Sequence, residues 1–424
     1  MLRPRSRLLH QCSRMLQRRS RTLQLAGSCA LSLAGALFAL AALSALPALP
    51  AQDKPPQDTS AYCRACQTHG KVPCSKHGKM LEKEQAPIVV NCSVAAECKA
   101  CGGALACDCK QCVDTKVEAE LAKRQELVRD WLAKRRQTID ALTAREPYAH
   151  LQTTHYDLAM TLKPATVGKD KIDQHQRLHL YGERLEALRD LFLATLELPD
   201  AELPDRMSVL MSEEAKDHGV LGPRLTGMGT QNSVGLKLMG PEYVYSMWAD
   251  KRSMPDDEAV HRNIVHNVSH LLLSQMKPAM FLGNQSAGWL DEGVAHWMED
   301  KAVGKCTNFC FEEVLLQSPA SFKGGKWRPA VRKYVDEGKA IEFAVLATKN
   351  TDQLNYVEHT FAFAFVDFLI AKYGGAKLRD LIRLAKKKKP MREALQEVYG
   401  LGPLTIDAPF QAWVKETYSP LLER

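Results

Sequence analysis

Three kinds of feature are missing from most of this 424-residue sequence. Beyond residue 51 no apolar stretch has the length of a transmembrane helix, so any membrane span is confined to residues 1–51. The net charge of residues 52–424 is also close to zero. Of the formal charge of +8, seven units come from arginines in residues 1–22, which leaves +1 for the rest. That balance gives no electrostatic case for nucleic-acid binding. No C-x-x-C pair is followed by histidine, which excludes c-type haem attachment.

Residues 1–51 have the three parts of an export signal. The arginine-rich start contains no acidic residue, residues 23–51 are uncharged and largely apolar, and the run ends in the small-residue site Ala48-Leu49-Pro50-Ala51. Arg18-Arg19 is a weak match to a twin-arginine signal. The alternative is an uncleaved N-terminal anchor, because the apolar run is long enough to span a bilayer. We expect an exported protein, periplasmic, cell-surface or secreted, that touches a membrane only through this segment if it stays uncleaved.

Cysteine is concentrated in residues 52–113, where nine of the 13 cysteines lie. Cysteines two residues apart suit tetrahedral zinc. The spacing allows two sets of four ligands: Cys63, Cys66, Cys74 and His77, and Cys98, Cys101, Cys109 and Cys112. Disulfides are the alternative, because export favours them. Removing residues 1–51 leaves 11 cysteines, an odd number that cannot all pair within one chain. Cys92 and Cys107 are left over and could pair. In both cases the module is predicted to need metal sites or disulfides for its stability, because it is short and poor in large apolar residues.

The rest of the chain predicts an α+β protein. Residues 114–147 form a long amphipathic helix that Pro147 ends, and residues 150–424 form one further domain. Residues 215–240 are glycine-rich and predict a loop and hairpin, and Lys386–Lys389 predicts a solvated helix end. Strands are predicted at 151–161, 207–211 and 243–247, and helices at 178–198, 257–275, 289–301, 357–372, 376–386 and 391–399.

A pair of histidines carries the strongest chemical signal. His266 and His270 lie four residues apart in a predicted helix, so both imidazoles face the same side and can reach one metal ion. Glu292, in the next predicted helix, can supply a third ligand. Asn267 stands where the H-E-x-x-H motif has its catalytic glutamate.

The segment His266–His270 followed by Trp289–Ala295 (W-L-D-E-G-V-A) resembles the gluzincin peptidases, the superfamily of thermolysin and the zinc aminopeptidases. Residues 356–374 resemble the helix that follows the site in peptidase-MA-like domains. The resemblance implies a gluzincin-like domain, mostly helical around the site with a small sheet. It implies zinc held by His266, His270 and Glu292, with water in the fourth position.

The resemblance also suggests roles for other residues. Asp291 could orient a zinc-bound histidine, and Tyr356 either stabilises an oxyanion or is a core aromatic residue. For His296 and Glu299 we expect structural roles.

Asn267 limits the chemistry. An amide cannot accept a proton from water near neutral pH, and general acid–base catalysis is worth roughly 10²–10⁴-fold. Three interpretations follow: a zinc-binding protein without peptidase activity, a metal-free pseudoenzyme, or a hydrolase that uses another carboxylate such as Asp291. We therefore predict an exported gluzincin-like homologue that is inactive or impaired in peptide hydrolysis. The alternative is a cell-surface scaffold that binds a peptide or protein in the former active cleft and through the cysteine-rich module.

Overall fold

The computed structural model describes residues 71–76, 89–108, 110, 115–143, 147–229, 233–240, 242–310 and 322–420. Residues Ala61–Arg424 form one compact unit. The expected export segment lies outside the described residues. So do five of the eight predicted ligands of the cysteine-rich module: Cys63, Cys66, His77, Cys109 and Cys112. Among the described residues, no helix combines the length and apolar character needed to cross a membrane.

A six-stranded mixed sheet forms the centre of this unit. Its strands, in spatial order, are β2 (Val89–Cys92), β4 (Ala149–Thr153), β5 (Tyr156–Met160), β8 (Met207–Ser212), β10 (Tyr243–Trp248) and β9 (Gly235–Met239). Strands β5, β8 and β10 are parallel to one another, and the pairs β2–β4, β4–β5 and β9–β10 are antiparallel. Two small sheets, β1 (Lys71–Pro73) with β3 (Ala106–Asp108) and β6 (Ala165–Val167) with β7 (Asp170–Ile172), lie apart from it.

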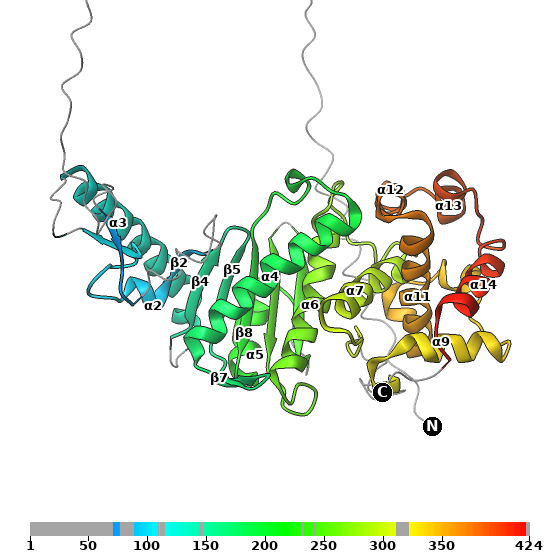
Figure 1. The fold of residues 1–424 in the computed structure, drawn as a ribbon, viewed down its shortest axis with the longest axis horizontal. Helices are drawn as coiled ribbons and strands as arrows, with labels where there is room; N and C mark the ends of the chain where they lie inside the picture. Colours follow the sequence, from blue (N-terminus) through cyan, green and yellow to red (C-terminus); the bar gives the residue numbers. More distant parts are fainter. Residues whose placement is uncertain are drawn as a thin grey trace, which may run out of the picture. The chain divides into compact units, whose positions relative to one another are not determined.

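Helices cover both faces of the sheet. Side chains alternate along each strand, so Val209 and Met211 of β8 join the larger core while Leu210 between them joins a smaller one. The larger core is closed by α4 (Gln174–Leu196) and α6 (Asp257–Gln275), which lie across the same face in Figure 1. The smaller core lies on the other face, under α5 (Ala215–Thr226).

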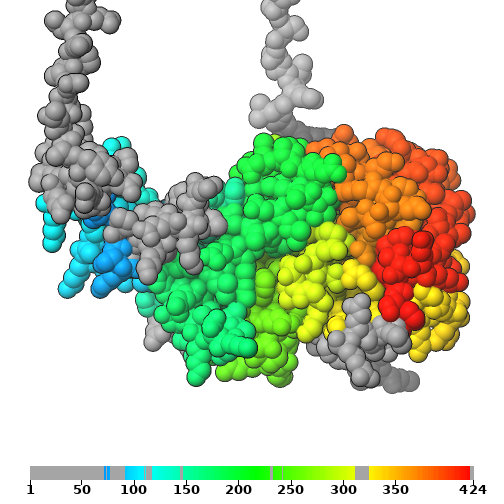
Figure 2. All heavy atoms as spheres, viewed as in Figure 1, coloured from blue at the N-terminus to red at the C-terminus, as the bar shows by residue number. Residues whose placement is uncertain are grey.

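The chain after the sheet is helical and continues the larger core. Figure 2 shows this part, coloured yellow to red, meeting the green sheet-and-helix part along one continuous surface. Its helices are α7 (Gly288–Val303), η3 (Phe322–Gly325), α9 (Trp327–Asp336), α10 (Phe343–Leu346), η4 (Thr351–Gln353), α11 (Tyr356–Tyr373), α12 (Gly375–Lys386), α13 (Met391–Tyr399) and α14 (Asp407–Thr417). Further helices elsewhere are α2 (Ser93–Ala96), α3 (Thr115–Thr138), η1 (Asp140–Leu142) and η2 (Asp200–Glu202). The fold is thus a mixture of helix and sheet.

Three local expectations were wrong. Residues 215–226 form helix α5 and not a loop. Gly222 lets this helix pack closely on β9, where Leu236 would lie 2.9 Å from an added Cβ atom. Residues 151–161 are two strands, β4 and β5, joined by a tight turn. In the run predicted to be solvated, Lys387 and Lys388 are exposed, but Lys386 is only 1% exposed.

The cysteine-rich segment is joined to the rest of the chain through the main sheet. Strand β2, from residues expected in a separate module, pairs with β4, and Cys92 lies opposite Leu151. The adjoining helix α3 lies beside this end of the sheet in Figure 1.

Candidate metal centre

Helix α6 holds the histidine pair in a fixed position. The Asp256 side chain caps the helix by accepting a hydrogen bond from the Ala259 N–H at 2.8 Å. Asp257 at the first helical position accepts bonds from Arg177 and Arg184 of α4, at 2.9 and 2.7 Å. The start of α6 is therefore tied to α4.

His266 and His270 lie on the buried side of α6, and both are almost fully buried. Their Nε2 atoms are 3.2 Å apart. The four-residue spacing thus brings two ring nitrogens to one point, as the sequence predicted for residues on one helix face.

Helix α7 brings Glu292 to the same point. One carboxylate oxygen, Oε2, lies 3.5 Å from His266 Nε2, and the other, Oε1, lies 3.6 Å from His270 Nε2. Trp289 fixes the start of the helix by packing edge-on against Phe343, with ring centroids 4.8 Å apart.

The fourth group is a cysteine that the sequence analysis did not single out. Cys310 Sγ lies 3.4 Å from Nε2 of both His266 and His270. Lys237, from the edge strand β9, donates a hydrogen bond to the same sulfur at 3.0 Å. The resemblance implied water in the fourth position, but the structure places a thiol there.

The four groups have the separations of ligands around one tetrahedral zinc ion. Bond lengths of about 2.0–2.1 Å to nitrogen and oxygen and about 2.3 Å to sulfur put pairs of ligands about 3.3–3.6 Å apart. For the five pairs other than Glu292 with Cys310, the observed separations run from 3.2 Å to 3.6 Å, and the donor atoms of all four residues lie within 4.8 Å of one another. Two imidazoles, a carboxylate and a thiolate also form an ordinary donor set for zinc.

Two acidic residues contact the outer nitrogens of the histidine rings. Asp291 Oδ2 lies 3.0 Å from His270 Nδ1, and Glu299 Oε2 lies 3.3 Å from His266 Nδ1. A carboxylate at Nδ1 favours the tautomer that leaves Nε2 free to bind a metal. Asp291 thus occupies the orienting position expected for it, and Glu299 does the same for the second ring.

The buried charges of the site shift one another's pKa values. Burial raises the pKa of the Cys310 thiol, and so does Glu292, but Lys237 and the two histidines outweigh both and lower it to about 6. Burial would also raise the pKa of Glu292, yet the neighbouring histidines hold it well below its usual range. Burial would lower the pKa of His266, but the Cys310 sulfur and the acidic side chains keep it well above its usual value.

Glu292 provides a test of whether a metal fits. It is fully buried, and within the described part of the chain neither of its oxygens accepts a hydrogen bond. A buried carboxylate without a hydrogen bond is costly unless a cation compensates it. A zinc ion among His266, His270, Glu292 and Cys310 would supply that charge, so these residues fit the group that the resemblance implies.

Glu292 also belongs to a second group of donors, on the side of α11. His296 Nε2 and His359 Nδ1 lie 3.6 and 3.5 Å from Glu292 Oε2 and 3.0 Å from each other. All three side chains are fully buried and are placed to hold a metal. Burial lowers the pKa of His296 to about 3, so its imidazole is neutral. His296 and Glu299, for which structural roles were expected, thus lie within the same polar cluster.

The two predicted catalytic residues, Asn267 and Tyr356, are both half-buried. The amide of Asn267 donates back to the carbonyl of Asn263 on its own helix, at 2.8 Å. Tyr356 begins α11, and it is His359, one turn later, that reaches Glu292.

The described cysteines of the cysteine-rich segment do not group as in the two ligand sets that the sequence spacing predicted. Cys74 lies with Cys98 and Cys101, with all three sulfurs within 4.8 Å of one another. The sequence had assigned Cys74 to the first set of ligands and the other two to the second. Cys92 does not lie beside Cys107. It lies 3.6 Å or less from two histidines of α4, and Cys107 donates to the Ala100 carbonyl at 3.3 Å.

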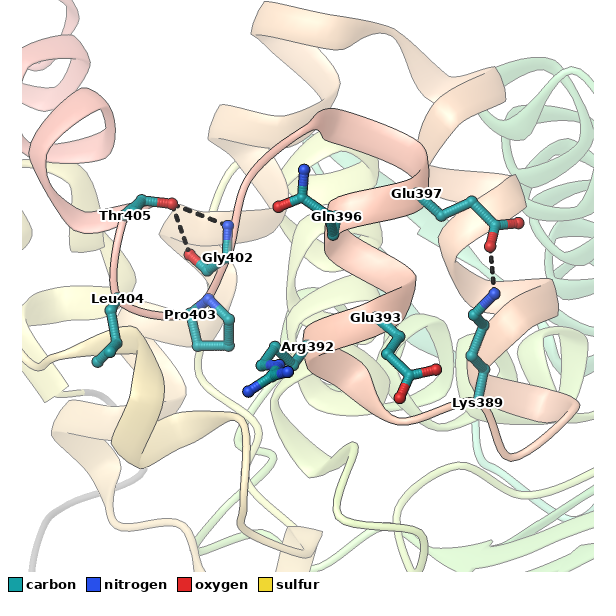
Figure 3. A pocket seen from close by; sticks show the side chains of 9 residues that line it. All are labelled: Lys389, Arg392, Glu393, Gln396, Glu397, Gly402, Pro403, Leu404 and Thr405. Carbon is teal, nitrogen blue, oxygen red and sulfur yellow. Dashed lines mark hydrogen bonds and ion pairs between the residues drawn. The ribbon is translucent and has the colours of Figure 1, made fainter.

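A surface pocket lies elsewhere, at helix α13 and the loop after it. Figure 3 shows its lining, in which Lys389 pairs with Glu397 and Thr405 bonds to Gly402. None of the metal-centre residues lines this pocket.

Comparison with known proteins gives distant similarity only. No protein-family model matches the sequence, and no curated protein does. Among solved structures, the chain is similar to an M1 zinc metallopeptidase from Deinococcus radiodurans, with 12% identity and a TM-score of 0.33 over 64% of this chain and 50% of that one. A point mutant of that enzyme matches with 11% identity and a TM-score of 0.31, over 64% of this chain and 51% of that one. The chain thus spans about half the length of these metallopeptidases.

Proposed function

We propose that this chain is a metallopeptidase-like zinc-binding protein whose zinc centre is closed and does not hydrolyse peptides. The observation that carries the proposal is the 3.4 Å separation of Cys310 Sγ from both His266 Nε2 and His270 Nε2. Catalytic zinc sites have three protein ligands and leave one position to water or substrate, whereas structural sites have four protein ligands. This centre has four.

Each of the surrounding residues has a role in such a centre. Asp291 and Glu299 orient the two imidazoles, and Lys237 lies where it offsets the negative charge of the Cys310 thiolate. When bound, zinc would act as a Lewis acid. Asn267 has no group that accepts a proton near neutral pH, so a substrate would also meet no general base at that position. Two independent features therefore oppose peptide hydrolysis.

Metal analysis of the purified protein tests the proposal. We expect zinc in the wild type, and less of it in the His266→Ala variant. With cobalt in place of zinc, the thiolate-to-cobalt absorption should decrease in Cys310→Ala by the contribution of this centre. Cys306→Ala is the matched control, because Cys306 is buried four residues away and donates to the His296 carbonyl instead. An unchanged cobalt spectrum in Cys310→Ala, or casein hydrolysis by the wild type, would overturn the proposal.

Export is the second part of the proposal and rests on residues 1–51. The arginine-rich start, the uncharged apolar run and the small-residue site together have the pattern of a signal peptide. Fractionation of cells that express the full chain, with N-terminal sequencing of the product, tests it. A mature N-terminus near Gln52 outside the cytoplasm is the expected result, and an unprocessed cytoplasmic chain would contradict it.

A further inference from the structure

A second pair of histidines lies on another helix, with the same spacing as the first. His175 and His179 occupy the first two turns of α4, four residues apart, and both are half-buried. Their Nε2 atoms are 2.9 Å apart and the rings meet edge-to-face, with centroids separated by 4.6 Å. The pair therefore presents two ring nitrogens to one point beside the helix.

A buried thiol meets this pair. Cys92 Sγ lies 3.6 Å from His175 Nε2 and 3.5 Å from His179 Nε2, and the residue is 2% exposed. Cys92 ends strand β2, and its position is set by the pairing of β2 with β4. The thiol and the histidines thus come from separate elements, more than 80 residues apart in the sequence, and each is fixed by its own backbone.

The three atoms have nearly the separations of zinc ligands. About 3.6 Å between nitrogen and sulfur follows from the bond lengths of tetrahedral zinc, and 2.9 Å between nitrogens is slightly shorter than the about 3.3 Å expected. A hydrogen bond between the two imidazoles would explain their approach but not why one sulfur lies near both Nε2 atoms. A shared ion accounts for all three separations.

We propose that Cys92, His175 and His179 form a further metal site, which takes zinc. Two imidazoles and a thiolate are ligands that bind zinc well and calcium or magnesium poorly. The site shares no residue with the centre at His266, so it does not depend on the function proposed above. Its three protein ligands leave one position of a tetrahedral ion to water or another group. The ion joins the edge strand β2 to helix α4, and so joins the cysteine-rich segment to the sheet domain.

The test compares zinc content in full-length protein. The double variant His175→Gln, His179→Gln should hold one zinc fewer per chain than the wild type, measured by inductively coupled plasma mass spectrometry. His261→Gln is the matched control, because His261 is a half-buried helical histidine that belongs to none of the groups of potential ligands found among the described residues. A double variant with the zinc content of the wild type would overturn the proposal.

Two further variants separate this site from the other centre. The His266→Ala variant should lose the zinc of the other centre. A triple variant that combines His266→Ala with the His175 and His179 changes should then hold one zinc fewer per chain than His266→Ala alone. If only one of the two losses occurs, only the corresponding site exists. Cys92→Ser should remove part of the thiolate-to-cobalt absorption while the contribution of Cys310 stays.

Circular dichroism must show that each variant is folded. If the double variant does not fold, the single change His179→Gln decides, because it leaves two ligands in place. That variant should release one zinc to a chelator at least about 10-fold faster than the wild type, since even weaker changes around zinc ligands cost about 10–100-fold in affinity. Release at the wild-type rate would refute the site.

Discussion

Oδ2 of Asp291 lies 3.0 Å from Nδ1 of His270, on the side of the ring opposite the nitrogen that faces Cys310. A carboxylate beside Nδ1 favours the tautomer with the proton on that nitrogen and leaves Nε2 free to bind a metal. Asp291 directly precedes Glu292 in α7. One turn of helix thus supplies a metal ligand and also orients a ligand on α6.

The first prediction concerns this contact. Asp291→Asn should weaken zinc binding at the His266 centre by roughly 10–100-fold, the usual cost of losing a residue that orients a zinc ligand. Competition with a chromophoric chelator measures it. Asp300→Asn is the control, because Asp300 lies on the same helix but pairs with Arg328. Equal zinc affinity in the wild type and Asp291→Asn would contradict the orienting role.

The second prediction concerns catalysis. Asn267→Glu alone should not yield a peptidase, because Cys310 still fills the fourth position. Cys310→Ala alone should not either, because the general base is still missing. The combined variant should hydrolyse casein at least about 10²-fold faster than either single variant, the lower range of general acid–base catalysis. A combined variant that hydrolyses casein no faster than Cys310→Ala alone would refute the argument from the missing base.

The third prediction concerns the glycine after Glu292. A Cβ atom on Gly293 would lie 2.5 Å from the Ala362 carbonyl oxygen of α11, so α7 and α11 touch backbone to backbone. Gly293→Ala should lower the free energy of unfolding by about 1–3 kcal/mol, as overpacking does. Urea unfolding measures this. The control, Gly219→Ala in α5, should be neutral or stabilising, because nothing lies within 4 Å of the added atom.

The fourth prediction concerns Lys386, whose ammonium donates to the carbonyls of Leu273, Ser274 and Met276 at the end of α6. Burial lowers its pKa to about 7, against the opposing effect of Asp291. The lysine keeps its proton in the unfolded chain up to about pH 10.4. Between these values the unfolded state binds more protons, so this residue makes stability rise with pH, by at most about 1.4 kcal/mol per unit.

Urea unfolding at several pH values between 7 and 10 tests this. In Lys386→Met, the increase of stability with pH that comes from Lys386 should be absent. Lys387→Met should keep it, because Lys387 is exposed. The same pH dependence in Lys386→Met and in the wild type would show that another group is responsible.

Local patterns in the sequence predicted much of the fold. The helix predicted at 257–275 has these same bounds in the structure, and those predicted at 289–301 and 357–372 differ by one or two residues at each end. These segments carry apolar residues at helical spacing together with caps, and both signals lie within a few residues of chain. Residues 215–226 were missed because glycine argues against a helix locally, whereas close packing of α5 on β9 requires it.

The candidate site was only partly predictable for a related reason. His266 and His270 share a helix face, so their approach to each other follows from local geometry. Cys310 reaches them from a segment without regular structure, and His359 comes from a helix more than 60 residues beyond Glu292. Neither has a spacing signal, because tertiary packing alone brings them in. The same applies to Cys92, which only tertiary packing brings to His175 and His179.

At each edge of the main sheet lies a cysteine thiol that faces a pair of histidines. Strand β2 ends at Cys92, and β9 carries Lys237, which donates to Cys310. Among the described strands, each of these two pairs with one neighbour only, so their amides should exchange with solvent sooner than those of β5 and β8. Removing metal should therefore speed hydrogen exchange first at the two outer strands, while the centre of the sheet stays protected.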